Sequence, residues 1–300
     1  MVFTRAQKRT LDSPEEPPSK RKPTTNFPSL FEPPKTHLDS TDLLKNTEIN
    51  KLLLEKANIN NVQQLERYLR VEKYGKGDML LGARVPDIRK ISTLIGELNF
   101  NVLRELLQSS IHEKRLLALV NLVTQYQKNQ VDPNLNTTNK DNIFKFYMEM
   151  REGIDNWDLV DTSASQIVGV HLYNKNEDFK KKWIYETLAV SPRLWDRRIA
   201  IVATRYFVAR KKFDDTLKLA EMFIEDSEEL VHKATGWVLR EYGDQDMSGF
   251  YQFLNKNAAR MPRIMYDQST RKIPETMKSK YRKMRLEKAN KEKKHENSST

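Results

Sequence analysis

The chain has 300 residues, carries a formal net charge of +11 and contains no cysteine. This excess of positive charge favours a polyanionic partner, either nucleic acid or an acidic membrane surface. The lack of cysteine excludes disulfide bonds and cysteine-containing zinc sites, and the five histidines show no metal-ligand spacing.

The first 40 residues are expected to form a disordered, proline-rich basic tail. Seven of the twelve prolines fall within residues 14–34, and proline removes backbone donors and blocks helix interiors. The tail contains the run Lys20-Arg21-Lys22, which is either a nuclear-import signal or a solvated charge run. We therefore expect a nuclear location if the run is a signal, and a cytoplasmic one otherwise.

Residues 41–285 show the periodicity of a single all-α domain. Apolar residues recur there at three- and four-residue spacing, and no alternating strand pattern competes with them. Pro86 suits the first turn of a helix, where its missing N–H costs nothing. The expected helical segments are residues 41–54, 62–69, 86–98, 103–107, 116–126, 143–150, 160–173, 179–188, 192–206, 217–224, 230–242 and 250–254.

Short polar links between these segments predict stacked antiparallel helix pairs. Such pairs build an α-solenoid, in which each pair buries its apolar stripe against the next. A compact helical bundle is the alternative. The segment 286–300 is expected to be a frayed basic tail, and no run of about 18 apolar residues predicts a membrane span.

The most informative motif is the run 156–161, Asn-Trp-Asp-Leu-Val-Asp. On a helix, Trp157 and Asp161 lie one turn apart on the same face. An indole beside a carboxylate suits contact with a cationic centre. The plainer interpretation makes Trp157 a core residue and Asp161 a helix-capping or backbone-binding residue.

Two further tryptophans have charged neighbours within one helical turn. Trp195 is followed by Arg197 and Arg198, and Trp237 follows Lys233 by four residues. A groove lined by indoles, basic residues and one carboxylate suits contact with a sugar-phosphate backbone. The alternatives are core packing for the indoles and an ion pair with an acid on a neighbouring helix for Arg198.

Four motifs in order carry a resemblance to a known family. They are residues 74–86 (YGKGDMLLGARVP), 156–161 (NWDLVD), 195–200 (WDRRIA) and 233–242 (KATGWVLREY). Together they resemble the DNA alkylation repair (AlkD-like) glycosylase family over roughly residues 45–285.

The resemblance implies an α-solenoid of HEAT-like helix pairs whose basic concave face holds duplex DNA. It also implies excision of N3- or N7-alkylated purines without full enclosure of the lesion. Asp161, four residues after Trp157, corresponds to the family's catalytic aspartate. Trp237 corresponds to a second tryptophan of the catalytic site, and Arg198 to a DNA-contacting arginine.

The residue types suit this chemistry on their own terms. A cationic purine is already a good leaving group, so the main requirement is a carboxylate that stabilises the developing oxocarbenium-like sugar and positions water. No metal or organic cofactor is required. Arg197, Lys233 and Arg263 are further candidates for DNA contact, with simple solvation as the alternative. Tyr68 and Tyr74 are equal candidates for an aromatic contact.

The favoured function is therefore a monofunctional glycosylase acting on duplex DNA that contains alkylated bases. No lysine is placed as a Schiff-base nucleophile, and the absence of a heptad seam favours a monomer. The alternative is a non-catalytic HEAT-like scaffold that binds damaged or branched DNA. A third possibility, a protein-binding solenoid, does not explain the basic residues beside the tryptophans.

Overall fold

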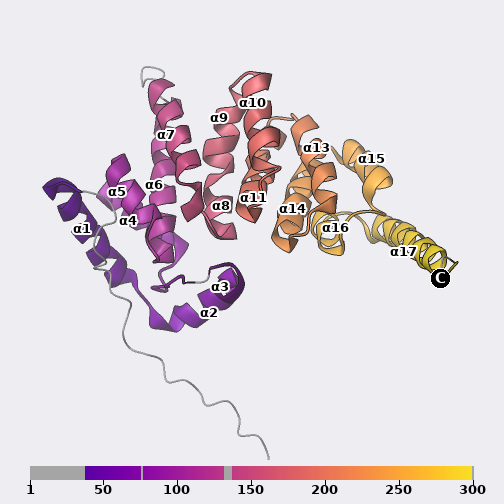
Figure 1. Cartoon of the computed structure of the whole chain (residues 1–300), viewed down its shortest axis with the longest axis horizontal. Coiled ribbons are helices and arrows are strands. Elements are labelled where there is room, and N and C mark those ends of the chain that lie inside the picture. The colour runs from indigo at the N-terminus through magenta and orange to yellow at the C-terminus, as the bar shows by residue number, and fades with distance from the viewer. Residues whose placement is uncertain (1–37, 76, 132–136, 299–300) are drawn as a thin grey trace, which may run out of the picture.

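The computed structural model describes residues 38–75, 77–131 and 137–298 (Figure 1). The expected disordered tail falls almost entirely outside these residues, and so does its Lys20-Arg21-Lys22 run. The first described helix begins at Ser40. Asp39 caps that helix by accepting the backbone N–H of Asp42.

The described chain is built from helices. The N-terminal part contains α1 (Ser40–Lys56), α2 (Ile59–Leu69), α3 (Val71–Tyr74), α4 (Val85–Ile95), α5 (Phe100–Leu107), α6 (His112–Val131) and α7 (Thr137–Glu149). The central part contains η1 (Arg151–Gly153), α8 (Trp157–Ser163), η2 (Ser165–Gly169), α9 (Val170–Tyr173), α10 (Glu177–Trp183), η3 (Ile184–Leu188), α11 (Leu194–Ala203) and α12 (Arg205–Val208). The C-terminal part contains α13 (Asp214–Met222), η4 (Phe223–Glu225), α14 (Glu229–Gln245), α15 (Met247–Asn257), α16 (Arg263–Ser269) and α17 (Glu275–Ser298).

The helices stack side by side in chain order, as a solenoid requires (Figure 1). The helices α6, α8, α11, α14 and α16 form one row in which each packs against the next. The prediction of an all-α solenoid is confirmed. Within residues 38–298, apart from the two gaps, pairing of strand type is limited to an isolated bridge between Met79 and Ile111.

A continuous apolar core runs along this row. Each helix contributes a fully buried side chain to it, namely Leu117, Leu159, Ile199, Leu239 and Met265. The contact between α14 and α16 is especially close, because a Cβ added to Gly236 would lie 2.5 Å from the carbonyl oxygen of Met265. Glycine at this position therefore lets the two helix backbones approach.

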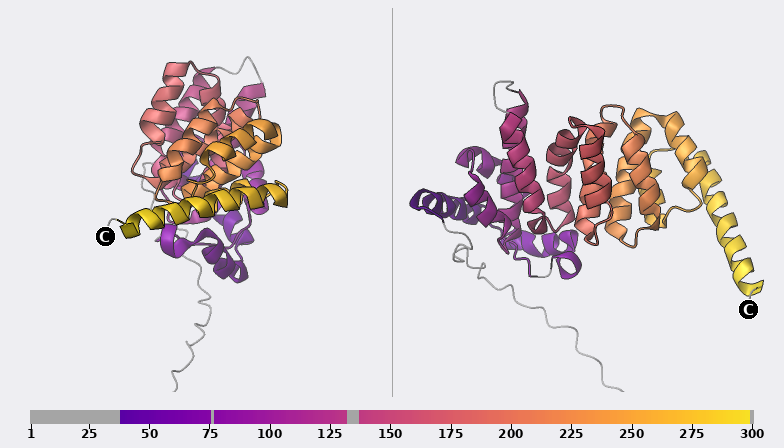
Figure 2. Two further views of the ribbon diagram at one scale, coloured as in Figure 1. Left: turned by 90° about the vertical axis from the view of Figure 1, so that its right-hand side faces the viewer. Right: turned by 45° about the horizontal axis from the view of Figure 1, so that its top comes forward.

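The short helices α2 and α3 form an arm that lies beneath the row, close to α8 (Figures 1 and 2). Leu69 is the one residue of the two helices that is fully buried. Most of the arm is thus exposed, and it borders the body without being part of the core. This placement matters because the arm forms one wall of the candidate site.

The last helix, α17, projects from the C-terminal end of the solenoid (Figure 2). Its first half is attached to the body through Tyr281, which is fully buried, and through Arg285, which donates to the carbonyl of Ala258. The helix continues through residues 286–298, where we expected a frayed tail. The segment lacks proline and glycine and is rich in lysine and glutamate, so it favours helix once α17 has been started by its anchored half.

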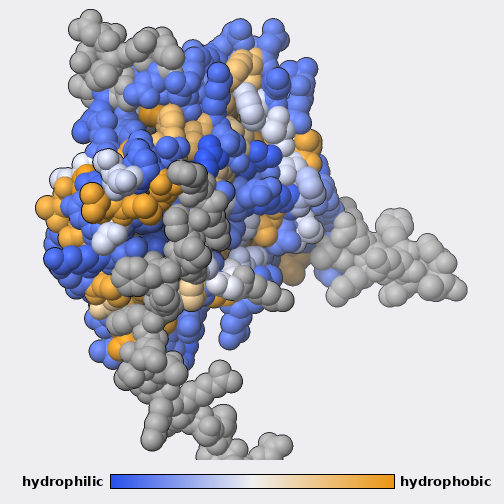
Figure 3. All heavy atoms as spheres, turned by 60° about the vertical axis from the view of Figure 1, so that its left-hand side comes forward, coloured by the Kyte–Doolittle hydropathy of each residue, from blue (hydrophilic) through white to orange (hydrophobic). Residues whose placement is uncertain are grey.

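The N-terminal end of the solenoid has a mainly hydrophilic surface with small hydrophobic patches (Figure 3). Leu44 on α1 and Leu94 on α4 are among the exposed apolar residues there. A mostly polar outer face suits the terminal repeat of a solenoid. None of the described helices combines the length and apolar character needed to cross a membrane.

Candidate active site

The helix α8 begins at the motif singled out in the sequence. Asn156 is fully buried, and its side-chain oxygen accepts the backbone N–H of Trp157 at 2.7 Å. Its amide nitrogen donates to the carbonyl of Leu69 at 3.2 Å. One side chain therefore both starts the helix that carries Trp157 and Asp161 and holds the end of the α2 arm against it.

Trp157 and Asp161 border the same cavity from α8. The cavity has a volume of about 980 Å³ and lies between α2, the start of α4, one face of α6 from His112 to Gln127, and α8. Tyr68 on α2 meets Trp157 edge to face, with 4.8 Å between ring centroids and an angle of 82° between the planes. Two aromatic rings and a carboxylate are thus brought together, although the sequence alone did not indicate the cavity or choose Tyr68 over Tyr74.

Arg198 on α11 holds the carboxylate of Asp161 at two points. Its Nε and Nη2 atoms donate to the two carboxylate oxygens at 3.0 and 2.8 Å. Its Nη1 atom donates to the carbonyl of Leu230 at the start of α14. Burial raises the pKa of Asp161, while the charge and hydrogen bonds of Arg198 oppose that rise.

In this structure Arg198 forms an ion pair with an acid on a neighbouring helix, which is the alternative to a DNA contact that the sequence left open. The guanidinium is buried, whereas the Asp161 side chain keeps 20% of its surface exposed. Arg198 therefore fixes the orientation of Asp161 in this structure. Its predicted contact with a DNA phosphate stays a prediction.

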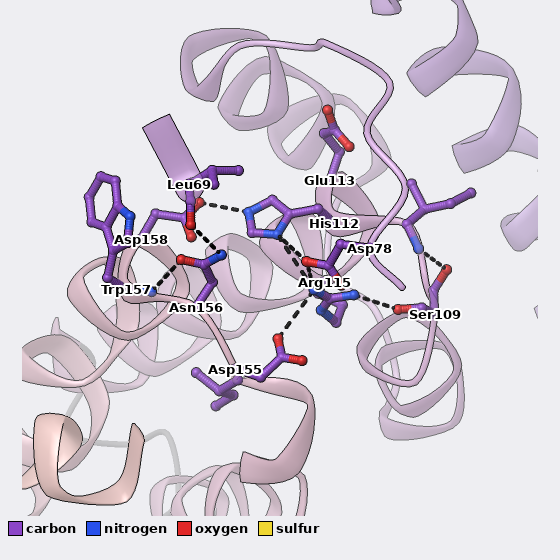
Figure 4. Close-up of polar contacts among 12 residues, drawn as sticks. Leu69, Asp78, Ser109, His112, Glu113, Arg115, Asp155, Asn156, Trp157 and Asp158 are labelled. Atoms are coloured by element: carbon purple, nitrogen blue, oxygen red, sulfur yellow. Dashed lines mark hydrogen bonds and ion pairs between the residues drawn. The ribbon is translucent and has the colours of Figure 1, made fainter. Parts of the chain in front are cut away.

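Next to the pair of Arg198 and Asp161 lies a network of charged side chains, most of which are buried (Figure 4). His112 on α6 contacts Asp158 through Nε2 at 2.8 Å and Asp78 through Nδ1 at 3.3 Å. Arg115 donates to Asp78 at 2.6 Å and lies 3.2 Å from Asp155. The network ties the loop before α4 and the start of α6 to the start of α8, and so fixes the backbone that carries Trp157.

The protonation of His112 follows from its partners. Burial lowers the pKa of His112, but the negative charge and hydrogen bonds of Asp158 and the bond to Asp78 outweigh this effect and raise it to about 9. The imidazole is therefore charged at neutral pH and donates from both nitrogens. The spacing of residues in the sequence gave no signal for this role.

Glu113, the next residue along α6, holds the loop that borders the cavity. Its buried carboxylate accepts the backbone N–H of Leu81 at 3.0 Å and of Gly82 at 2.8 Å. Gly82 has a φ of +80°, and a Cβ there would lie 2.0 Å from the carbonyl oxygen of Asn58. Only glycine fits this position, where the loop crosses the start of the arm.

Trp237 does not line the cavity with Trp157 and Asp161. It lies on α14, half-buried, with the guanidinium of Arg205 4.0 Å from the centre of its ring. Arg205 in turn donates to both carboxylate oxygens of Glu241, at 2.8 and 2.9 Å. The structure thus adds Arg205 to the surroundings of this predicted site residue, a role that the motif spacing did not indicate.

The other predicted DNA contacts differ in how strongly they are paired within the chain. Arg197 donates to both oxygens of Asp226, and Lys233 lies 2.7 Å from Glu229. The Arg263 side chain is 92% exposed and lies 3.6 Å from Asp267. Arg263 is therefore the most accessible of these candidates, and the other two would have to exchange a carboxylate for a phosphate.

In the part of the chain that the structure describes, no three histidine, aspartate or glutamate side chains are grouped as a metal ion would require. Three carboxylates among the described residues line the cavity: Asp158 is bound by His112, Asp161 by Arg198, and Glu113 by the backbone N–H groups of the loop before α4.

The model of the DNA alkylation repair enzyme family matches residues 49–273, which is most of the chain and includes the whole candidate site. The chain belongs to the DNA alkylation repair enzyme family. A solved structure described as a predicted DNA alkylation repair enzyme from Enterococcus faecalis is similar in fold, with a TM-score of 0.52 and 14% sequence identity. The similarity covers 73% of this chain and 97% of that one. A search of curated proteins gave no significant match.

Membership of this DNA alkylation repair family supports a role in DNA repair. The family match ends at residue 273, so α17, which begins at Glu275, lies beyond the matched region. The family match confirms the resemblance that the four sequence motifs indicated. The roles of individual site residues remain predictions, to which the geometry adds the partners described above.

Proposed function

We propose that this protein is a monofunctional DNA glycosylase that removes cationic N3- or N7-alkylated purines from duplex DNA. The observation that carries the proposal is the Asp161 carboxylate, fixed by Arg198 and partly exposed in a cavity that Trp157 and Tyr68 also border. The indole and phenol faces attract a positively charged purine, and the carboxylate attracts the positively charged sugar.

In the proposed reaction the bond between C1′ and the purine nitrogen breaks. Its electron pair neutralises the alkylated ring, which leaves as a free base, and the deoxyribose becomes oxocarbenium-like. Asp161 stabilises that charge, and a water molecule forms the new bond to C1′ and gives up a proton to Asp161, which passes it to solvent. Arg198 keeps the carboxylate in one orientation, which reduces the reorganisation needed during the reaction.

The test is release of 7-methylguanine or 3-methyladenine from duplex DNA by the full-length protein. We expect Asp161→Asn to lower the single-turnover rate by about 10²–10³, the usual effect of removing an aligned charge partner. Asp178→Asn is a suitable control, because Asp178 lies exposed on the distant helix α10. Undiminished release by the Asp161 variant would contradict the assignment of the carboxylate.

A second candidate function is a non-catalytic scaffold that binds damaged or branched DNA. The same ion pair favours it in one respect, since a guanidinium bound at both carboxylate oxygens neutralises part of the charge available to a sugar cation. This function predicts salt-sensitive DNA binding by the parent protein without release of any methylated base.

A further inference from the structure

The arm formed by α2 and α3 turns sharply at Arg70. This residue has φ 54° and ψ 47°, a left-handed conformation that residues other than glycine seldom adopt. The turn ends α2 and starts α3, and the Arg70 side chain reaches α14, which lies far along the sequence. Its Nη1 atom is 3.3 Å from Oε1 of Glu229, the first residue of α14.

The same carboxylate oxygen is bound by a second cation. Nζ of Lys233, one turn further along α14, lies 2.7 Å from Oε1 of Glu229. Two cations therefore converge on one anionic oxygen, and one of them, Arg70, lies 159 residues before Glu229 in the sequence. All three side chains are accessible, with exposed fractions of 40% for Arg70, 38% for Glu229 and 27% for Lys233.

On both the arm and α14, this cluster directly adjoins in sequence a residue that binds the candidate active site. On the arm, Arg70 directly follows Leu69, whose carbonyl binds Asn156, and lies two residues after Tyr68. On α14, Glu229 directly precedes Leu230, whose carbonyl binds Arg198. The two cations thus lie beside main-chain groups that position Trp157 and Asp161.

We propose that Arg70 and Lys233 form a phosphate-binding site that Glu229 occupies in the free protein. A DNA phosphate replaces the carboxylate, accepts hydrogen bonds from both cations and leaves Glu229 to solvent. The inference rests on the proposed function, because the phosphate belongs to the DNA on which the protein acts. It adds Arg70, which the sequence motifs did not indicate, and gives Lys233 a defined partner.

The exchange is favourable for two reasons. An exposed ion pair stabilises a protein only weakly, so release of Glu229 costs little. A phosphate offers several charged oxygens to the guanidinium and the ammonium, whereas the two cations now share a single carboxylate oxygen. The Arg70 side chain is largely exposed, so it can adjust to a duplex while Asn156 holds the adjacent backbone at Leu69.

The experiment measures the affinity of the full-length protein for an undamaged duplex across a range of salt concentrations. Glu229→Gln removes the resident charge and keeps the size of the side chain. We expect it to tighten binding about threefold to tenfold, since it ends the repulsion between Glu229 and phosphate. Arg70→Asn tolerates the left-handed backbone and should weaken binding, with the slope of log K against log salt reduced by about one.

Matched variants separate this site from effects of overall charge. Glu221 on α13 pairs with Lys256 on α15, so Glu221→Gln makes the same charge change at a distant surface pair. Arg70→Lys restores a cation and should recover part of the affinity. The double variant Glu229→Gln with Arg70→Asn should lose the gain of Glu229→Gln alone.

Equal tightening by Glu221→Gln and Glu229→Gln would overturn the proposal, because net charge would then explain the effect. Weaker or unchanged binding by Glu229→Gln would also overturn it and would make the ion pair a structural link between arm and body. Neither result bears on the proposed glycosylase activity, which is tested separately by the release of methylated base. Failure of the parent protein to bind DNA would overturn both proposals.

Discussion

Arg198 donates two hydrogen bonds to Asp161, and this pairing places a predicted DNA contact inside the solenoid. The arginine and the aspartate come from neighbouring helices of the row, α11 and α8. For the proposed glycosylase, the pair predicts that Arg198 affects the chemical step through Asp161. A phosphate contact would instead affect DNA affinity, so the two roles are separable by experiment.

We expect Arg198→Lys to reduce the rate of base excision by about tenfold to a hundredfold, because a lysine cannot hold both carboxylate oxygens in one plane. Affinity for undamaged DNA should change by less than about twofold. Single-turnover release and binding across a salt series measure the two effects. Arg263→Gln is the comparison. Because the Arg263 side chain is exposed, its loss should lower DNA affinity and leave the rate of base excision nearly unchanged. Lower affinity and a lower salt slope for Arg198→Gln, which removes the positive charge, would restore Arg198 as a phosphate contact.

Tyr68 and Tyr74 were equivalent in the sequence but differ in the structure. Tyr68 is 64% exposed and meets Trp157, whereas Tyr74 packs against the buried Trp195. We expect Tyr68→Ala to slow excision about twofold to tenfold with little loss of stability, and Tyr68→Phe to keep the rate. Tyr74→Ala should instead lower the melting temperature. The reverse pattern of rates and melting temperatures would assign the aromatic contact to Tyr74.

The charge on His112 predicts a dependence of stability on pH. Its pKa of about 9 in the folded protein exceeds the ordinary value of 6.5, so the folded state binds the proton more tightly. The resulting stabilisation is fully present below pH 6.5 and is lost as the pH rises through 9; it amounts to on the order of 3 kcal/mol. Urea unfolding of His112→Gln should therefore show lower stability than the parent at pH 6 and a smaller difference above pH 9.

The matched control for this titration is His171→Gln. Burial, with a smaller contribution from Lys175, lowers the pKa of His171 to about 4, so this imidazole stays neutral throughout the same range. Its replacement should leave the slope of stability against pH unchanged between about pH 7.5 and 9, the range in which His112 still titrates. Below about pH 7 the same replacement removes the rise of stability with pH that comes from protonation of His171 in the unfolded chain. Parallel curves for the parent protein and His112→Gln would mean that His112 gains no proton affinity on folding.

Gly82 tests the loop that connects the arm to the body. We expect Gly82→Ala to destabilise the protein by about 2–4 kcal/mol, because the added Cβ would overlap the carbonyl of Asn58 and disturb the backbone that Glu113 binds. Gly77→Ala separates steric overlap from backbone strain as the cause of the loss. Gly77 also has a positive φ, but there is open space around its Cβ position. Equal losses in urea unfolding would attribute the effect to backbone conformation alone.

The sequence determined the helical architecture and one local part of the site. Periodicity located most of the helices but not α3 or α16, and Pro86 correctly indicated the first turn of α4. The four-residue interval between Trp157 and Asp161 was enough to place them one turn apart on α8, because helix geometry fixes how residues three and four apart are related. The motifs also led to the correct family.

The tertiary structure decided which side chains from different helices meet. The pairing of Arg198 with Asp161, the choice of Tyr68 over Tyr74 beside Trp157, and the contact of Arg70 with Glu229 all join segments far apart in the chain. Periodicity gives the face of a helix that is buried, but not its axial offset or rotation relative to its neighbours. Those quantities come from the packing of whole helices, and they set the partners of every charged residue in the site.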